Sequence, residues 1–353
     1  MNTPSSAPQA PDPQALTADP AWLPHKLDMG KGVVQFARIG REGLAREAFL
    51  DARMSGSVEA AAEAPLEALA KCAPAPRPLP AFIFHTAFCC STLMARALDA
   101  PGGTLALKEP DILMGLANAY RMAKDAGAVG RIDAARDLVL RLLARPHQGS
   151  ERVVVKPTNT ANNLAPIIAG AGARTVFLYG DLKGFLVSVL KKGEACKAFV
   201  RKQYTIFALD KEGVGAIPER QALGLTDLQI AALVWRHQME MFARLLAAPG
   251  SEHLRSLDFR TLLDRPAETL IAANAHLRLG GDDGALKAAA EGPVFRTNSK
   301  FDDQDYDAGA RARDEAALIA RHEEELAMIE NWALQLKLAT DITSALPRPL
   351  IEA

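Results

Sequence analysis

The chain lacks a large excess of charge of either sign, and this limits what it can bind. Its 353 residues include 41 Lys and Arg against 42 Asp and Glu, for a formal net charge of −1. A protein that binds duplex nucleic acid through a broad face carries a clear basic surplus. We therefore expect no nucleic-acid partner, although this balance is compatible with a local pocket for an anion.

Cysteine is scarce, and long apolar runs are missing. The four cysteines, Cys72, Cys89, Cys90 and Cys196, include no CxxC pair. Their spacing suits neither a zinc site nor a secreted disulfide framework, so a reducing, cytoplasmic compartment is predicted. Proline, glycine and arginine interrupt the most apolar region, residues 164–179. We expect no membrane span as a result.

Composition divides the chain into three parts. The first 20 residues are rich in Pro, Ser, Ala and Gln and contain no Lys or Arg, so they are predicted to be a disordered tail, residues 1–20. Residues 21–78 predict an N-terminal extension with a strand at 33–39, a helix at 41–54, an Ala/Glu-rich helix and a Pro-rich linker. The main domain is then expected to occupy residues 79–345.

Short apolar runs alternate with helical patterns in the main domain. Strands are predicted at residues 81–85, 104–107, 153–155 and 175–179. Their alternation with helices predicts an α/β fold with a mainly parallel sheet flanked by helices, and such a sheet holds ligands at the carboxyl ends of its strands. The C-terminal half is mostly helical, with helices expected at residues 226–247 and 314–338.

One strand-to-helix segment has the pattern of an anion site. At residues 82–94 an apolar strand runs into a short polar turn and a helix that begins with two hydroxyl residues. Backbone N–H groups at such a turn and helix N-terminus hold phosphates. The predicted binding residues are Thr86, Ala87, Phe88, Cys89, Cys90, Ser91 and Thr92. Residues 85–92 contain no glycine or lysine, so this is not the GxxxxGK[ST] loop, and a strand-to-helix turn with two buried thiols is the alternative.

A second candidate lies on the helix expected at residues 181–192. At about 100° per residue, Ser188 and Lys192 share one face, opposite an apolar cluster, and Asp181 is placed to cap the helix. A hydroxyl and an ammonium group on one face can bind an anion, and a solvated helix face is the alternative.

Further segments follow in a recognisable order. They are Ala106-Leu-Lys-Glu-Pro110, Val155-Lys-Pro-Thr158, the strand and helix at residues 174–189, and Ser256-Leu-Asp-Phe-Arg260 with the helix after it. In this order the chain resembles the sulfotransferase family over roughly residues 80–280. That resemblance implies a nucleotide-kinase-like P-loop fold and 3′-phosphoadenosine 5′-phosphosulfate as the sulfuryl donor, with no metal.

The resemblance also implies roles for single residues. In the family the first loop and helix bind the donor's 5′-phosphosulfate, and a later arginine and serine bind its 3′-phosphate. The last two positions are Gly180 and Ser188 here. A basic C-terminal loop covers the donor in the family, which makes Arg296 and Lys300 expected contacts.

Two residues are candidates for the chemistry itself. Glu109 follows a strand and precedes Pro110, and it is the best candidate for the base that accepts the acceptor's proton. A carboxylate that caps a helix is the structural alternative for it. Lys156, at the end of the next strand, is the candidate for stabilising the transferring group.

Two departures from the family pattern leave alternatives open. Phe88 stands where the family has a lysine or arginine, and Gly180 stands where it has the phosphate-binding arginine. Charge-assisted hydrogen bonds are worth about 1.5–3 kcal/mol each, so other cations would have to replace them. Candidates are His85, Lys108, Lys183 and Lys191, besides the residues already named.

The leading prediction is sulfuryl transfer to a hydroxyl or amine of an unidentified small-molecule acceptor. One alternative is a non-catalytic or regulatory protein that keeps the fold with a degenerate donor site. The other is a phosphoryl-transfer enzyme on a related P-loop fold, which the missing loop lysine disfavours. No particular oligomeric state is indicated.

Overall fold

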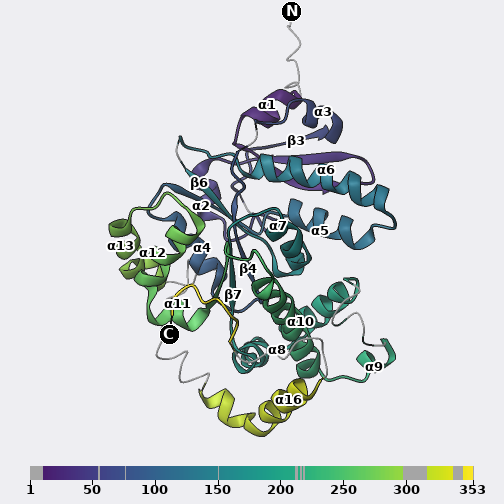
Figure 1. Cartoon of the computed structure of the whole chain (residues 1–353), viewed down its shortest axis with the longest axis vertical. Coiled ribbons are helices and arrows are strands. Elements are labelled where there is room, and N and C mark those ends of the chain that lie inside the picture. The colour runs from purple at the N-terminus through teal and green to yellow at the C-terminus, as the bar shows by residue number, and fades with distance from the viewer. Residues whose placement is uncertain are drawn as a thin grey trace, which may run out of the picture.

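The computed structural model describes most of the chain, as helices around two sheets (Figure 1). The described residues are 11–54, 56–75, 77–149, 151–210, 214, 217, 219–296, 316–336 and 345–352. The helices are α1 (Pro13–Ala18), α2 (Arg41–Arg46), α3 (Leu66–Lys71), α4 (Ser91–Asp99), α5 (Ile112–Met122), α6 (Ala126–Leu143), the 3-10 helix η1 (Asn159–Leu164), α7 (Ala165–Gly170), α8 (Leu182–Ala208), α9 (Glu219–Leu223), α10 (Asp227–Ala247), α11 (Phe259–Asp264), α12 (Pro266–Leu277), α13 (Asp283–Glu291), α14 (Pro293–Arg296) and α16 (Glu323–Gln335).

A five-stranded parallel sheet forms the centre of the molecule. Its strands, in spatial order, are β5 (Thr104–Lys108), β6 (Arg152–Lys156), β4 (Ala81–His85), β7 (Thr175–Tyr179) and β8 (Leu254–Asp258). Every neighbouring pair is parallel. The predicted α/β class with a parallel sheet flanked by helices is therefore confirmed, and the predicted strands match the observed ones to within a residue at either end.

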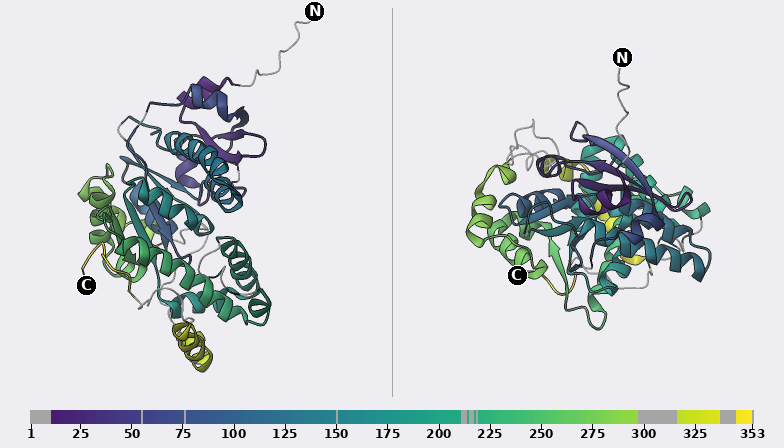
Figure 2. Two further views of the ribbon diagram at one scale, coloured as in Figure 1. Left: turned by 45° about the vertical axis from the view of Figure 1, so that its right-hand side comes forward. Right: turned by 90° about the horizontal axis from the view of Figure 1, so that it is seen from above.

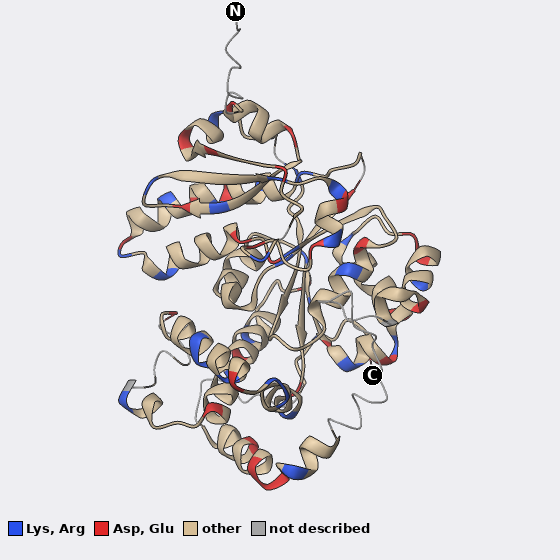
Figure 3. Cartoon of the chain, turned by 180° about the vertical axis from the view of Figure 1, so that it is seen from behind, with Lys and Arg blue, Asp and Glu red and all other residues tan. Residues whose placement is uncertain are grey.

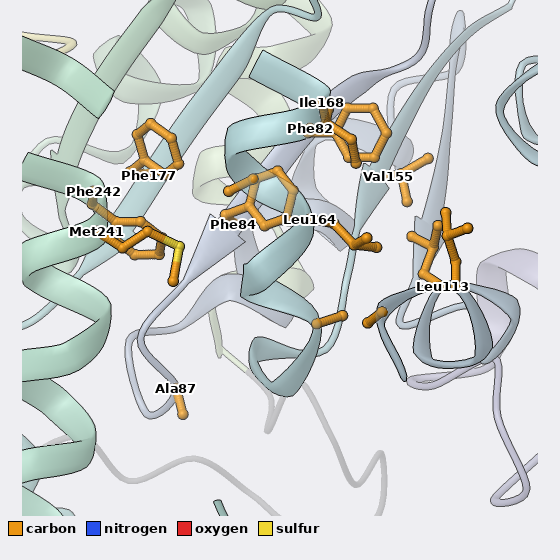
Figure 4. Packing of buried hydrophobic residues seen from close by; sticks show 14 of the residues in the cluster. Phe82, Phe84, Ala87, Leu113, Val155, Leu164, Ile168, Phe177, Met241 and Phe242 are labelled. Atoms are coloured by element: carbon orange, nitrogen blue, oxygen red, sulfur yellow. The ribbon is translucent and has the colours of Figure 1, made fainter. Parts of the chain in front are cut away.

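The two faces of this sheet pack against different helices, because side chains alternate along each strand. Phe82 and Phe84 pack into a cluster with α5, α6, α7, α8 and α10, whereas Ala81 and Ile83 pack with α4, α12 and α13. Figure 4 shows the first cluster, in which the rings of Phe177 and Phe242 stack with centroids 4.5 Å apart. Burial of each such side chain stabilises the fold by about 1.5–3 kcal/mol.

The N-terminal extension forms a separate antiparallel sheet in the order β1 (Trp22–Asp28), β2 (Val33–Arg38) and β3 (Ala60–Pro65). The Ala/Glu-rich helix expected before the Pro-rich linker is present as the short helix α3, but the first part of that stretch, Ala60–Pro65, forms the strand β3 instead. In β3, Ala64 pairs with Val34 and is buried, so pairing and burial override the helix propensity of alanine.

Two further expectations for the N-terminal region differ from the structure. The helix expected at residues 41–54 ends at Arg46, in α2. Residues 13–18, inside the stretch expected to be a tail, form α1, and Leu16 on this helix is fully buried. Arg145 also donates hydrogen bonds to the carbonyls of Leu16, Thr17 and Asp19, so both burial and hydrogen bonds hold this short segment against the core. Residues 1–10 lie outside the described part of the chain.

The extension is fastened to the edge strand of the parallel sheet. Lys108 at the end of β5 is fully buried, and its Nζ donates hydrogen bonds to the carbonyl oxygens of Leu44 (2.7 Å) and Ala45 (3.0 Å). The N–H of Leu50 donates to the carbonyl of Lys108 at 2.7 Å, and the N–H of Asp111 donates to the carbonyl of Leu50 at 3.1 Å. Lys108 therefore points toward the extension and is not available to an anion at the sheet's carboxyl end.

Long helices build the C-terminal half (Figure 2). A capping box at Thr226 begins α10, close to the predicted start. The helix α8 is interrupted at Gly193, whose φ of 61° and ψ of −147° are not helical. The expected helix at residues 314–338 is represented by α16, and part of that range lies outside the described residues. None of the helices in the described ranges is both long and apolar enough to cross a bilayer.

Burial of Lys108 makes a testable contribution to stability. Burial lowers the pKa of Lys108 from 10.5 to about 8. Between these values the unfolded chain binds more protons than the folded chain, so the contribution of Lys108 to stability rises with pH. The free energy of unfolding of the wild type minus that of Lys108→Met should increase by about 3 kcal/mol across this window. Urea titrations from pH 8 to 10.5 measure the rise. An equal rise in the difference between the wild type and Lys71→Met, a change at an exposed position, would contradict burial as the cause.

Candidate functional site

A cavity of about 510 Å³ opens at the carboxyl ends of the central strands. Its lining comes from the loop after β4, the residues after β5 and β6, the second half of α8, and the N-terminal extension. The last of these includes Phe49, Asp51 and Arg53. The cavity therefore lies where ligands bind in open parallel sheets, and the extension forms part of its wall.

The loop between β4 and α4 has a strained backbone at three positions. Ala87 (φ 73°), Phe88 (φ 54°) and Cys90 (φ 59°) are all left-handed, and so is Glu109 (φ 55°) after β5. Non-glycine residues in this region cost about 1–3 kcal/mol each and concentrate at functional sites. Left-handed residues next to right-handed ones turn successive N–H groups inward into a concave anion-binding surface.

The first turn of α4 offers further donors to the cavity. Ser91 and Thr92 line it, and no side chain caps the helix at Cys90. The unpaired N–H groups at a helix N-terminus, together with the helix dipole, attract anions. The predicted loop thus faces a cavity, with donors and hydroxyl groups on the side where an anion would lie.

His85 holds this loop in place. The N–H of Ala87 donates to His85 Nδ1 at 3.1 Å, and His85 Nε2 lies 3.1 Å from the carbonyl oxygen of Pro157 and 3.3 Å from Lys156 Nζ. Both ring nitrogens are therefore engaged. These contacts let His85 position the loop.

A network of buried side-chain amides on η1 and α10 also holds this loop. Gln238 on α10 accepts hydrogen bonds from Asn159 (3.1 Å) and Asn162 (3.0 Å), and its Nε2 donates to the carbonyl of Thr86 at 3.3 Å. Asn162 also donates to the carbonyl of His85 at 3.0 Å. The sequence analysis did not predict this network, although a glutamine inside the apolar stretch of α10 is a signal that could have indicated it.

A chain of charges lies beside the loop. Lys156 Nζ is 2.6 Å from Glu109 Oε1, and Arg53 Nη2 is 2.9 Å from Glu109 Oε2. The side chain of Lys156 is 1 % exposed and that of Glu109 is 12 % exposed. Burial raises the pKa of Glu109, but the charges and hydrogen bonds of Lys156 and Arg53 outweigh it, so the net pKa lies below the usual value. Glu109 is therefore ionised and held between two cations.

Phe88, at a position where the resemblance implies a cation, has a cation over its ring. Lys192 Nζ lies 4.0 Å from the Phe88 ring centroid, a cation–π distance. The rings of Phe185 and Phe199 pack around Phe88 at centroid distances of 5.1 and 6.1 Å. Lys192 therefore contacts the loop through the Phe88 ring, although it is not among the residues that line the cavity.

The backbone is closely packed at Gly180, after the end of β7. A Cβ there would lie 3.0 Å from the ring of Phe259, and the carbonyl of Gly180 accepts a hydrogen bond from Trp235 Nε1 at 2.7 Å. The predicted cap is present, since Asp181 accepts from the N–H of Gly184 at 2.9 Å. Arg260 Nη1 lies 2.8 Å from the Asp181 carboxylate, so a guanidinium reaches this strand end from the next segment.

The other predicted residues lie in different surroundings. Ser188 is half-buried on α8 and does not line the cavity. Thr86 is fully buried, with its carbonyl bound by Gln238. Arg296 is the last residue of α14, and its side chain is not described; Lys300 lies outside the described residues.

The two adjacent cysteines differ in environment. Cys89 is buried, and burial raises the pKa of its thiol to about 12. It donates to the carbonyl of Leu178 at 3.4 Å. Cys90 is half-buried and lines the cavity. Cys89 is therefore a neutral packing residue rather than a nucleophile.

Comparisons with known proteins show only distant similarity. No protein-family profile matches the chain, and no curated protein matches it. A sulfotransferase domain from the curacin biosynthetic pathway aligns with 78 % of this chain and 95 % of its own, at 14 % identity and a TM-score of 0.37. The sulfotransferase domain of an olefin synthase from Synechococcus PCC 7002 aligns with 74 % of this chain and 98 % of its own, at 12 % identity and a TM-score of 0.34. Both TM-scores are below 0.5, so neither similarity assigns a function to this chain.

Removing the charge of Glu109 should destabilise the fold. In Glu109→Gln the ammonium of Lys156 stays buried without its carboxylate, and breaking a buried pair in this way costs about 3–5 kcal/mol. Chemical denaturation should show a loss of about 3 kcal/mol. Glu268→Gln, which breaks an exposed pair with Arg265, is the matched control and should lose less than about 1 kcal/mol. Equal losses in the two variants would contradict a structural role for Glu109.

Proposed function

We propose that the protein transfers a sulfuryl group from 3′-phosphoadenosine 5′-phosphosulfate to a hydroxyl or amine of a small acceptor. The observation that carries this proposal is the strained loop at residues 87–90, followed by the uncapped first turn of α4, at the wall of a cavity. The order of the segments that resemble sulfotransferases supports the same assignment. The size of the cavity suits a small-molecule ligand, because such sites measure about 300–1,000 Å³.

Backbone donors and dispersed cations would hold the donor's phosphosulfate. Ser91 and Thr92 offer hydroxyl groups, and the first turn of α4 offers N–H groups. Lys192, over the Phe88 ring, is the proposed replacement for the loop cation. Ser188, one turn earlier on α8, stays a proposed contact for the 3′-phosphate, and Arg260 at the same strand end could supply the guanidinium that Gly180 lacks.

The reaction needs a proton acceptor and stabilisation of the leaving group. The acceptor's oxygen or nitrogen attacks sulfur, the bond from sulfur to the 5′-phosphate oxygen breaks, and the acceptor's proton passes to a base. Glu109 is the proposed base because it lines the cavity and is ionised. Lys156 then keeps it deprotonated, and Arg53 from the extension orients its second oxygen.

The residues around the rest of the cavity suit an acceptor with an apolar part. Phe49, Met114, Phe199 and Ile206 contribute apolar surface, and Asn118 adds a polar contact. An acceptor that lies against these residues would place its hydroxyl or amine near the loop and Glu109. Because these groups come from the extension, α5 and α8, the acceptor subsite is assembled from elements outside the sheet.

Donor binding can be tested with 3′-phosphoadenosine 5′-phosphate and calorimetry. Ser91→Ala and Lys192→Met should each weaken binding about tenfold, since each removes one hydrogen bond or charge, worth about 1.4 kcal/mol. Lys71→Met removes an exposed charge elsewhere and should leave affinity unchanged. No binding at millimolar ligand would favour a non-catalytic protein with a degenerate site. Stabilisation by ATP with a metal, and none by the bisphosphate, would favour phosphoryl transfer.

The lowered pKa of Glu109 sets an expectation for the pH profile. A base must be deprotonated to act, so a pKa held below the usual value of about 4.3 leaves Glu109 active at low pH. With an acceptor in hand, kcat/KM should show no acid limb between pH 7 and about 5. In the fraction of the Glu109→Gln variant that remains folded, kcat should fall at least about 100-fold. An acid limb centred near pH 6.5 would instead assign the base to a histidine.

A further inference from the structure

A second cavity, of about 460 Å³, lies at the opposite end of the parallel sheet. It is bounded by the linker before β4, the amino ends of β4 and β6, the turn before β7, and the C-terminal end of α12. Figure 1 shows α12 and β6 on the same side of the molecule, away from α8. None of the residues around this amino-end cavity lines the one described above.

Four arginines from four separate segments line the amino-end cavity: Arg77, Arg152, Arg174 and Arg278. Arg77, Arg152 and Arg278 are exposed, and the structure gives their side chains no hydrogen bond or ion pair with any described residue. Arg174 donates from Nη1 to the carbonyl of His276 at 2.9 Å. Guanidinium groups are the side chains best suited to bind phosphate or sulfate through paired N–H donors.

Glu151 also lines the amino-end cavity, but it does not neutralise the four arginines. Glu151 Oε1 is 2.7 Å from Arg41 Nε, and Glu151 Oε2 accepts from the N–H groups of His147 (3.0 Å) and Gln148 (2.9 Å). Arg41 in turn pairs with Asp99 at 2.8 Å. The Glu151 carboxylate is therefore committed outside the arginine cluster, and the cavity keeps a local positive charge in a chain whose net charge is −1.

The pKa of Arg174 reflects the positive charges around it. Burial lowers the pKa of Arg174, and the nearby charges of Arg278 and Arg255 lower it further. Like charges gathered without a counter-charge raise the free energy of the empty cavity, and a bound anion would relieve it.

We propose that the amino-end cavity binds a small polyanion, a molecule with two or more phosphate or sulfate groups. Four guanidinium groups from four segments offer more paired N–H donors than one phosphate or sulfate group can accept, so a polyanion suits this lining better than a single small anion. Pro78, Leu79, Pro146, Leu277 and Leu279 provide apolar surface between the arginines, which suits a ligand with an uncharged part. The site is independent of the sulfuryl transfer proposed above.

The shape and the surrounding charge favour a small ligand over a nucleic acid. The arginines surround a concave site, whereas a duplex needs an extended basic face. Figure 3 shows basic and acidic residues mixed along the helices rather than gathered on one side. The ligand is therefore expected to be enclosed by the four segments rather than laid across a surface.

Calorimetry with inorganic tripolyphosphate at 150 mM salt tests the proposal on the full chain. Arg152→Gln/Arg278→Asn should bind at least tenfold more weakly than the wild type, and asparagine keeps the left-handed backbone of residue 278 (φ 53°). The matched control is Arg131→Gln/Arg220→Gln, which removes two exposed arginines elsewhere and should leave the affinity unchanged. No binding by the wild type, or equal affinity in all three proteins, would overturn the proposal.

Hydrogen exchange distinguishes this site from the carboxyl-end cavity. Tripolyphosphate should slow amide exchange at residues 79–82, 172–175 and 277–279 in the wild type and not in Arg152→Gln/Arg278→Asn. Protection confined to residues 86–93 would place the anion in the other cavity and overturn the proposal. A failure here leaves the bisphosphate test of sulfuryl transfer unaffected, because that test uses Ser91 and Lys192.

Discussion

The buried ion pair of Lys156 and Glu109 connects the parts of the molecule that form the carboxyl-end cavity. Lys156 ends β6, Glu109 follows β5, and Arg53 brings the N-terminal extension to the same carboxylate. Neither charge could be buried alone, because an unpaired ion in the interior costs several kcal/mol. The strand ends, the extension and the cavity wall are therefore stabilised together, and a change at any of the three residues affects all of them.

The central sheet could be predicted from the sequence because its strands are short, apolar and buried on both faces. Residues 81–85 and 175–179 carry this signal without ambiguity, and the helices between them follow from their periodicity. The extension could not be predicted in the same way. All residues of β3 before Pro65 are alanine or glutamate, which favour a helix, and the pairing of β3 with β2 depends on a partner more than 20 residues earlier in the chain.

The candidate site was predictable where its signal is local and not where it is built from distant segments. The anion loop follows from a strand, a turn and two hydroxyl residues in direct succession. By contrast, Arg53, Gln238 and Arg260 come from elements that meet the loop or its neighbouring strand end only in the folded chain. The sequence shows no cation at Phe88 or Gly180, whereas the folded chain places Lys192 over the Phe88 ring and pairs Arg260 with Asp181, the residue after Gly180.

The loop after β4 reaches its left-handed conformations without glycine, which affects how it would meet a ligand. Ala87, Phe88 and Cys90 have far fewer accessible backbone states than glycine does. A glycine-rich loop gives up much of its freedom when a ligand orders it. Here that entropy is already lost when the chain folds, since His85 and Gln238 hold the loop. The concave surface is thus preorganised, and an anion would meet a shape that has no further ordering to undergo.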